Sequence, residues 1–283
     1  MIADDLIIIG TDGRGIGHVY AFERSTGNIR WKHAVTSGVP DGIGFPTDIV
    51  RTNSTIYTVA FGDELVCLDI KTGKIKWSYK SDFAGKEFIW SHAPSAEGSK
   101  IFFGGIDGVV YALDSETGRL IWKYNVGARI SAHPVARNGE LFVGAANGHI
   151  YRLNQKNGSV DADFALKSMP VGRFTFVNDS LFLFINSLGG DGGAQELVCL
   201  DQALTKVRWS QPAPKSWSLT TAKVWRSNVL TGTESGEVIA FRLTDGAMQW
   251  TEKLNGVIRS IGSSDKALYI GTLDGTLYAS SHD

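Results

Sequence analysis

The sequence predicts an all-β protein, a seven-bladed β-propeller of four-stranded antiparallel blades with tryptophan docking between the blades. Three observations carry this prediction. A short unit recurs along the 283 residues at intervals of roughly 39 to 47 residues, which is the period of a propeller blade. A tryptophan recurs at one register of that unit, and tight-turn dipeptides separate short alternating segments.

The clearest copy of the unit is Val110–Trp122, which reads VYALDSETGRLIW. Alternating residues predict a strand up to Asp114, Thr117–Gly118 predicts a tight turn, and a second strand carries Trp122. Further copies begin at Val19, Leu65, Ile150, Leu197 and Val238, and a shortened one begins at Leu277. The turn glycine recurs as Gly27, Gly73, Gly158 and Gly246.

The recurring ring is interpreted as packing between neighbouring blades, in preference to ligand binding. Its members are Trp31, Trp77, Trp122, Trp209 and Trp250, and the fourth copy has Ala162 instead. A strand pair precedes each unit, most clearly over 131–145, so each blade has strands A, B, C and D. Strands B and C meet at Asp107–Gly108, Asn147–Gly148 and Asp274–Gly275, which are strong hairpin signals.

Taken in order, the blades are expected at about 1–35, 45–80, 91–127, 130–166, 170–211, 217–254 and 257–283, a single domain. The first begins with strand B at Leu6–Thr11, and its A strand is missing or reduced to Met1–Ala3. The seventh ends at strand C. Either it has three strands and Met1–Ala3 is a short A strand, or the chain is part of a longer one. Both readings stay open.

The motifs Ala112–Leu113–Asp114, Thr117–Gly118 and Trp122 resemble the pyrroloquinoline-quinone-type propeller repeat, as do the equivalents in blade two. The resemblance covers nearly the whole chain. That family includes quinoprotein alcohol dehydrogenases, a lipoprotein of the bacterial outer-membrane assembly machine, and sensory or scaffolding propellers. The quinoproteins imply a calcium pocket and often two adjacent cysteines over the cofactor. This sequence has no adjacent cysteines and no haem motif, so a non-enzyme without cofactors is expected.

Composition narrows the function classes. The chain has 28 basic and 29 acidic residues without a basic stripe, which argues against nucleic-acid binding. The apolar runs are of strand length, so no membrane span is expected. No signal peptide is expected before the first strand. Cys67 and Cys199 share a register that is alanine in most other copies, and they are expected as free, buried thiols. A cytoplasmic location is expected, or a periplasmic one if the chain belongs to a longer protein.

All the long connections fall on one face, formed by the D–A connections and the B–C loops. They are 12–17, 36–46, 82–91, 186–196 and 212–218, and this D–A/B–C face is the candidate functional surface. Aligned inner strands predict a mixed-charge funnel at the mouth of the channel. Its candidate binding residues are Asp48, Trp90, His92, Arg129, His133, Arg173, Trp217 and Arg259.

Two features of this face, the funnel and the aromatic residues, each have two interpretations. The funnel could bind an anion, an acidic peptide or a small polar ligand, or its residues could simply solvate the rim, which is the favoured reading. Trp90 and Trp217, with Phe83 and Phe88, could form a partner patch or anchor the loops. No pattern of metal ligands is present. The expected function is a protein-interaction scaffold. The alternatives are a ligand-sensing propeller of a larger regulator and, less favoured, a quinone-dependent enzyme.

Overall fold

The computed structural model describes residues 2–11, 13–14, 16–36, 43–44, 49–52, 54–60, 64–82, 92–186, 195–212 and 222–281. All regular structure in these ranges is β-strand, which confirms the predicted all-β class. Within them no helical segment could span a lipid bilayer. The chain divides into two compact units. Unit 1 comprises Met1–Ala146 and Tyr151–Asp161, and unit 2 comprises Asn147–Ile150 and Ala162–Asp283.

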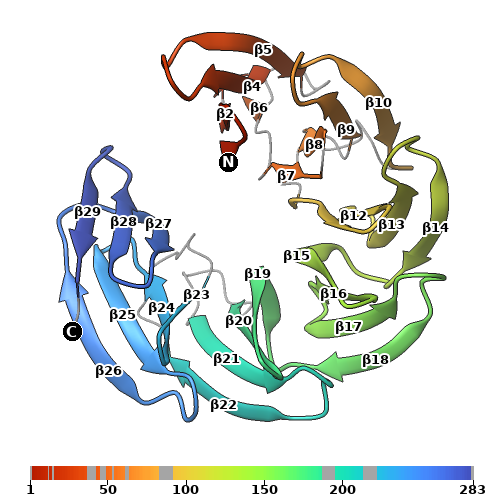
Figure 1. Ribbon diagram of the computed structural model, residues 1–283. Coiled ribbons are helices and arrows are strands. Elements are labelled where there is room, and N and C mark those ends of the chain that lie inside the picture. Colours follow the sequence, from red (N-terminus) through yellow and green to blue (C-terminus); the bar gives the residue numbers. More distant parts are fainter. Residues whose placement is uncertain are drawn as a thin grey trace. The chain divides into compact units, whose positions relative to one another are not determined.

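Unit 1 contains three antiparallel sheets of four strands, one for each of the first three repeats (Figure 1). The first has the order β1 (Ile2–Ala3), β2 (Leu6–Thr11), β4 (Ile16–Glu23), β5 (Ile29–Thr36). The second comprises β7 (Val50–Arg51), β8 (Thr55–Ala60), β9 (Glu64–Asp69) and β10 (Ile75–Lys80). The third comprises β11 (Ser95–Glu97), β12 (Lys100–Gly104), β13 (Val109–Asp114) and β14 (Leu120–Asn125).

The fourth repeat contributes β15 (Ile130–Arg137), β16 (Glu140–Ala145), β17 (His149–Asn154) and β18 (Val160–Ala165), and the boundary between the units falls within it. In unit 2 the fifth repeat comprises β19 (Met169–Val177), β20 (Ser180–Asn186), β21 (Gln195–Asp201) and β22 (Val207–Pro212). The sixth comprises β23 (Lys223–Trp225), β24 (Asn228–Gly232), β25 (Glu237–Arg242) and β26 (Met248–Lys253). The seventh has three strands, β27 (Ile258–Ser263), β28 (Leu268–Thr272) and β29 (Leu277–Ser280).

Most predicted strands lie within a residue of their expected positions. Ile2–Ala3 pairs with β2, so the first repeat has the short A strand that one of the two readings proposed. One pairing was not foreseen. β3 (Gly13–Arg14) pairs with β6 (Ile43–Gly44) inside stretches that the sequence predicted as irregular loops. The count of seven blades and the boundaries of a single domain remain predictions.

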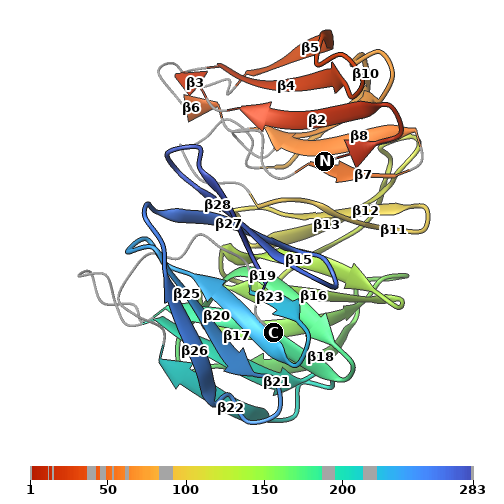
Figure 2. The same ribbon diagram turned by 60° about the vertical axis from the view of Figure 1, so that its left-hand side comes forward.

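The C strands β9 and β13 are buried on both faces because the sheets of neighbouring repeats pack against both of them. The middle residues of β9 and β13 are all buried. One cluster joins Ile8 and Ala21 of the first repeat to Val66 and Leu68 of the second, and Figure 2 shows these two sheets stacked. Burial on both faces accounts for the apolar runs in these strands.

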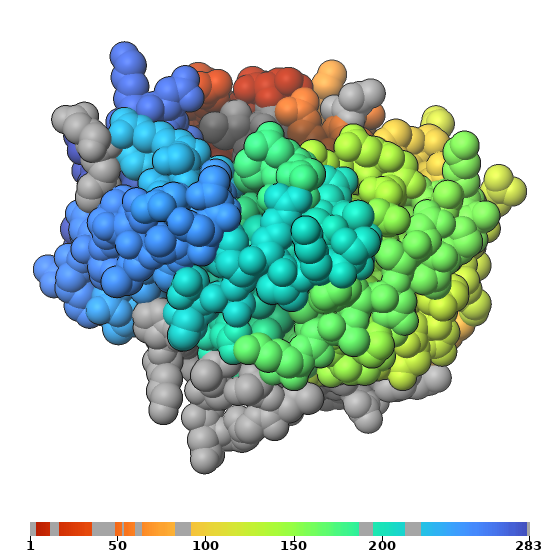
Figure 3. All heavy atoms as spheres, turned by 90° about the horizontal axis from the view of Figure 1, so that it is seen from below, coloured from red at the N-terminus to blue at the C-terminus, as the bar shows by residue number. Residues whose placement is uncertain are grey.

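The predicted docking of tryptophan between repeats is confirmed within each unit. Four rings donate Nε1–H to a backbone carbonyl of the next repeat: Trp31 to Ile70 at 3.0 Å, Trp77 to Ser115 at 3.3 Å, Trp122 to Gln155 at 3.0 Å, and Trp209 to Leu243 at 3.1 Å. The ring then lies over the turn glycine of that repeat. Figure 3 shows residues of the fifth repeat (cyan) adjoining the sixth (blue) at the surface of unit 2.

The turn glycine is therefore required for two reasons. Gly158 has φ +74°, a conformation that costs energy for residues with a side chain. A Cβ added there would also stand 2.7 Å from Cε3 of Trp122. The sequence predicted only the first reason. The same two reasons apply to Gly73, Gly118 and Gly246, which have positive φ and where an added Cβ would lie 2.5 to 2.6 Å from a ring atom.

Both the tryptophan and the glycine are absent where the fourth repeat meets the fifth. The fourth repeat has Ala162 at the tryptophan register, and the turn of the fifth repeat has Thr205 in place of glycine. In that turn Leu204 takes φ +58° and is buried. Since the fourth repeat has no ring at this register, no tryptophan contact requires a glycine in the turn of the fifth repeat.

Candidate functional site

Two histidines predicted for the funnel lie in contact in unit 1. The rings of His92 and His133 are 5.0 Å apart between centroids and pack edge to face. Nε2 of His92 donates to the carbonyl of Ile130 at 3.0 Å, and the amide of Ala93 donates to Nδ1 of His133, also at 3.0 Å. Each bond joins the third repeat to the fourth. These bonds place the pair between the third and fourth repeats.

The charge of His92 follows from its surroundings. Burial, with a smaller contribution from the guanidinium of Arg129, lowers the pKa of His92 to about 4 against the opposing effect of the hydrogen bond to the Ile130 carbonyl. His92 is therefore neutral near pH 7. Arg129 is exposed just before β15, and it supplies the positive charge at this place. An anion would meet an arginine here beside the neutral imidazole of His92.

The other described candidates lie in unit 2. Arg259 is exposed on β27, and Arg173 is half-buried on β19. Arg173 follows Gly172, which has φ +76°, within an irregular stretch of the β19–β20 pairing. Nε of Arg173 is buried and has no hydrogen-bond partner among the described residues. Such a donor is costly unless a further group accepts its hydrogen.

The remaining candidates, Asp48, Trp90 and Trp217, lie outside the described residues, as do most of the long connections. The structure thus brings together Arg129, His92 and His133 within unit 1. Their binding role, and the assembly of all eight residues into one funnel, remain predictions.

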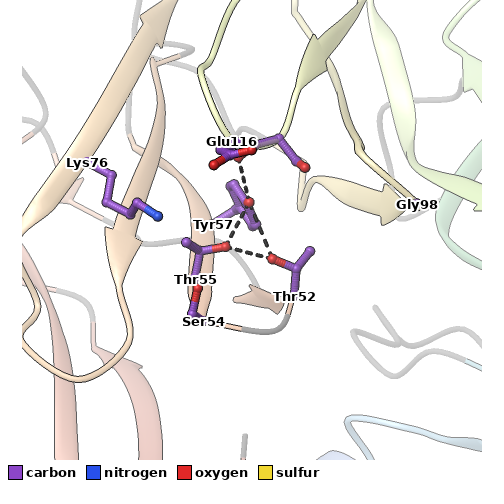
Figure 4. A pocket seen from close by; sticks show the side chains of 8 residues that line it. Thr52, Ser54, Thr55, Tyr57, Lys76, Gly98 and Glu116 are labelled. Atoms are coloured by element: carbon purple, nitrogen blue, oxygen red, sulfur yellow. Dashed lines mark hydrogen bonds between the residues drawn. The ribbon is translucent and has the colours of Figure 1, made fainter.

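A polar pocket of about 200 Å³ lies on the opposite face, between the second and third repeats. It lies beside the A–B turns of both repeats and the C–D turn of the third (Figure 4). The lining residues are Thr52, Ser54, Thr55, Tyr57, Lys76, Gly98, Ser115 and Glu116. Sequence analysis singled out none of them.

Three of the hydroxyls that line the pocket are hydrogen-bonded to each other. Thr55 Oγ1 lies 2.6 Å from Thr52 Oγ1 and donates to the Tyr57 hydroxyl at 2.8 Å. Tyr57 in turn donates to the Ser115 carbonyl at 2.8 Å, the same oxygen that accepts Nε1–H of Trp77. This series of hydrogen bonds connects the second repeat to the third. Lys76 and Glu116 remain as exposed charges at the mouth.

A sequence signal for this network exists in the register of the B strands. Tyr57 pairs with Cys67 just as Phe102 pairs with Ala112 and Phe182 with Cys199. A tyrosine at a register that holds phenylalanine in two other repeats predicts a buried hydroxyl that needs a partner. Burial raises its pKa, so the hydroxyl stays protonated and able to donate.

The two cysteines test the fit to a quinone cofactor. Cys67 lies in β9 of unit 1 and Cys199 in β21 of unit 2; each is free and fully buried. Burial raises the pKa of each thiol to about 11, which makes both unreactive. The chain does not supply the adjacent pair that the quinoprotein resemblance implies, so no step is derived through a quinone. Among the described side chains, no group of three His, Cys, Asp or Glu could hold a metal ion.

The fold is a β-propeller built from pyrroloquinoline-quinone-type repeats. Its four-stranded sheets, and the packing of a tryptophan from one repeat on the turn of the next, define this class. The chain belongs to the family described as outer membrane protein assembly factor BamB, whose sequence model matches residues 15–89 and 80–283.

Individual relatives match parts of this sequence. The assembly factor BamB of Legionella pneumophila (strain Paris) is 25% identical over 148 residues, which cover 50% of this chain and 36% of that protein. A quinoprotein ethanol dehydrogenase of Pseudomonas aeruginosa is 32% identical over 84 residues, covering 28% of this chain and 14% of that enzyme. The matched segments therefore span well under two thirds of these relatives' lengths.

The crystal structure of BamB from Moraxella catarrhalis superposes with a TM-score of 0.78 at 20% identity, covering 99% of this chain and 83% of that one. At this identity the likeness shows the fold. The predicted resemblance to the repeat family is thus confirmed. The expected cytoplasmic location finds no support, because the family that matches the chain takes its description from outer-membrane assembly.

Proposed function

We propose that this protein is a non-catalytic scaffold that binds another protein or a peptide through its D–A/B–C face. The observation that carries the proposal is the match over residues 15–89 and 80–283 to a family described by its part in protein assembly. A place in the bacterial cell envelope follows from the same description.

The use of the two faces supports this choice of surface. The C–D turns are occupied by structural contacts: Asp69 and Asp114 accept bonds from their own turns, and the turn glycines receive tryptophan rings. The A–B turn at Asn138–Gly139 donates to Glu97 of the preceding repeat at 2.7 and 3.1 Å. Groups already engaged between repeats are poorly available to a partner, which favours the opposite face and its long connections.

Affinity capture from an extract of the source cells tests the proposal. The bait is the full chain, and the variant has the connections 83–91 and 187–194 replaced by two-residue turns. A second variant, Arg129→Ala, removes the exposed cation beside the histidine pair. The matched control is the double change Lys76→Ala and Glu116→Ala, which removes the charges at the mouth of the pocket on the opposite face.

We expect a partner that is retained by the full chain and by the control, and that is lost or weakened in both D–A/B–C variants. A partner that survives the shortened loops but is lost with Lys76 and Glu116 would assign binding to the other face and overturn the proposal. Oxidation of an alcohol by the purified chain, in the presence of a quinone and a reducible dye, would overturn its non-catalytic part.

A second candidate, a sensor of a small anion, is favoured by one observation. The buried Nε of Arg173 lacks a partner among the described residues, and a carboxylate or phosphate would satisfy it. Calorimetric titration with inorganic phosphate and with acetate tests this candidate. Heat that disappears in Arg173→Gln supports it, and equal heat from both proteins removes it.

A further inference from the structure

The polar pocket between the second and third repeats carries two side chains of opposite charge, and all of its lining belongs to unit 1. Lys76 lies on β10, and Glu116 lies in the turn between β13 and β14. Both are exposed, and within the described ranges neither forms an ion pair. The nearby carboxylate of Asp69 is bonded to Thr72, which lowers its pKa, and Lys76 adds to that effect without an ion pair.

The hydrogen bonds between the pocket's hydroxyls run in one direction. Tyr57 donates its only hydroxyl hydrogen to the Ser115 carbonyl, which can only accept. Thr55 therefore donates to Tyr57, and Thr52 donates to Thr55 across 2.6 Å. The hydroxyl hydrogen of Thr52 is thus used, and its Oγ1 offers a ligand only lone pairs.

The pocket consequently calls for two kinds of ligand group. Thr52 Oγ1 and the Glu116 carboxylate accept hydrogen bonds, whereas the Lys76 ammonium only donates them. Figure 4 shows the side chain of Lys76 pointing toward the bonded hydroxyls. A molecule with both a cationic N–H group and a carboxylate satisfies the acceptors and the ammonium together.

Volume and lining limit the size and character of such a molecule. The pocket measures about 200 Å³, whereas drug-sized ligands occupy pockets of about 300–1,000 Å³. Five of its eight lining residues carry a hydroxyl and none is aliphatic, so the lining offers little to an apolar group. A small polar ligand fits both features.

We propose that this pocket binds a small zwitterion with N–H donors, an α-amino acid with a short polar side chain. The ligand's ammonium donates to Thr52 Oγ1 and to the Glu116 carboxylate, and its carboxylate accepts from Lys76. The ligand then bridges the second and third repeats. Because the pocket lies on the face opposite the proposed partner surface, this inference does not rest on the proposed function.

Calorimetric titration of the full chain with L-serine tests the proposal. We expect saturable heat with a dissociation constant on the order of 1 mM, because few atoms of so small a ligand contact the protein. Glycine betaine is the matched control ligand, since it has the same two charges and no N–H. It should bind about tenfold more weakly, as for the loss of a charged hydrogen bond. Acetate and methylammonium, which each carry one of the two charges, should also bind more weakly than L-serine.

Two protein variants locate the binding. Lys76→Gln and Glu116→Gln should each weaken L-serine binding about fivefold, as for the loss of an exposed ion pair. The matched control is Lys74→Gln, because Lys74 is exposed just before β10 and does not line the pocket; it should leave the affinity unchanged. Thermal unfolding checks that each variant is folded.

Three results would overturn the proposal: no saturable binding of L-serine, equal binding of glycine betaine, or an affinity that both pocket variants retain. Acetate that binds as tightly as L-serine would also overturn it, because the pocket would then recognise a lone carboxylate such as a peptide C-terminus.

Discussion

The contact between tryptophan and the turn glycine of the next repeat makes a quantitative prediction. The perturbation is Gly158→Ala, compared with Gly27→Ala. Both glycines occupy the same place in their C–D turns and both have φ +74°. An added Cβ at Gly158 would meet Cε3 of Trp122 at 2.7 Å and Cδ2 at 2.9 Å, whereas at Gly27 no described atom lies within 4 Å.

The two variants share one cost and differ in the other. A left-handed conformation costs an alanine about 1–2 kcal/mol relative to glycine, and this cost applies to both. Overpacking against a fixed ring adds about 1–3 kcal/mol at Gly158 alone. Gly27→Ala should therefore lower the free energy of unfolding by about 1–2 kcal/mol and Gly158→Ala by about 2–5 kcal/mol.

Urea denaturation followed by circular dichroism measures both losses. The double change Gly158→Ala with Trp122→Ala is the decisive control, because removal of the ring removes the clash. In the Trp122→Ala background, Gly158→Ala should cost only what Gly27→Ala costs. Equal losses of unfolding free energy for Gly27→Ala and Gly158→Ala in the wild-type background would show that the contact between Trp122 and Gly158 does not contribute to stability.

Three further outcomes follow. Trp122→Ala should cost about 3–5 kcal/mol as the truncation of a buried ring, and a loss below about 1 kcal/mol in urea denaturation would contradict its burial. The pKa of His92 falls from an ordinary 6.5 to about 4 on folding. As the pH is lowered, this histidine is therefore protonated in the unfolded chain before it is protonated in the folded protein. Stability from this group is complete above pH 6.5 and is lost as the pH falls toward 4, by about 3 kcal/mol in all. His92→Gln, which keeps a donor for Ile130, should show a shallower fall in thermal stability over that window; an unchanged slope would count against the assignment. Tyr57→Phe removes the hydroxyl that accepts from Thr55 and donates to the Ser115 carbonyl, and should cost about 1–2 kcal/mol in the same denaturation assay, with Tyr20→Phe at a half-buried site as the near-neutral comparison.

Local patterns predicted most of the fold. Alternation and turn chemistry in Val110–Trp122 are properties of neighbouring residues, so β13, its turn and β14 could be located from sequence. The contact of Gly118 with Trp77 joins separate repeats and therefore leaves no local pattern. The β3–β6 pairing joins two residues to two residues, which is too short for any periodicity.

The candidate site was less predictable for a related reason. Alignment of repeats brought His92 and His133 to neighbouring strands, and the structure places their rings in contact. Their hydrogen bonds to the main chain depend on register shifts in β15 between Ile130 and Val135, which sequence does not express. The pocket at Tyr57 was missed because an alternating strand pattern treats tyrosine and phenylalanine alike.

Hydrogen exchange on a captured complex tests the central claim most directly, because it reports which face the partner covers. A scaffold that works through the D–A/B–C face should gain protection in the amides around Ala93, Arg129 and Ile130. The turn at Ser115–Glu116 on the opposite face should exchange as it does in the free chain. Protection at Ser115–Glu116 with unchanged exchange around Arg129 would contradict the account.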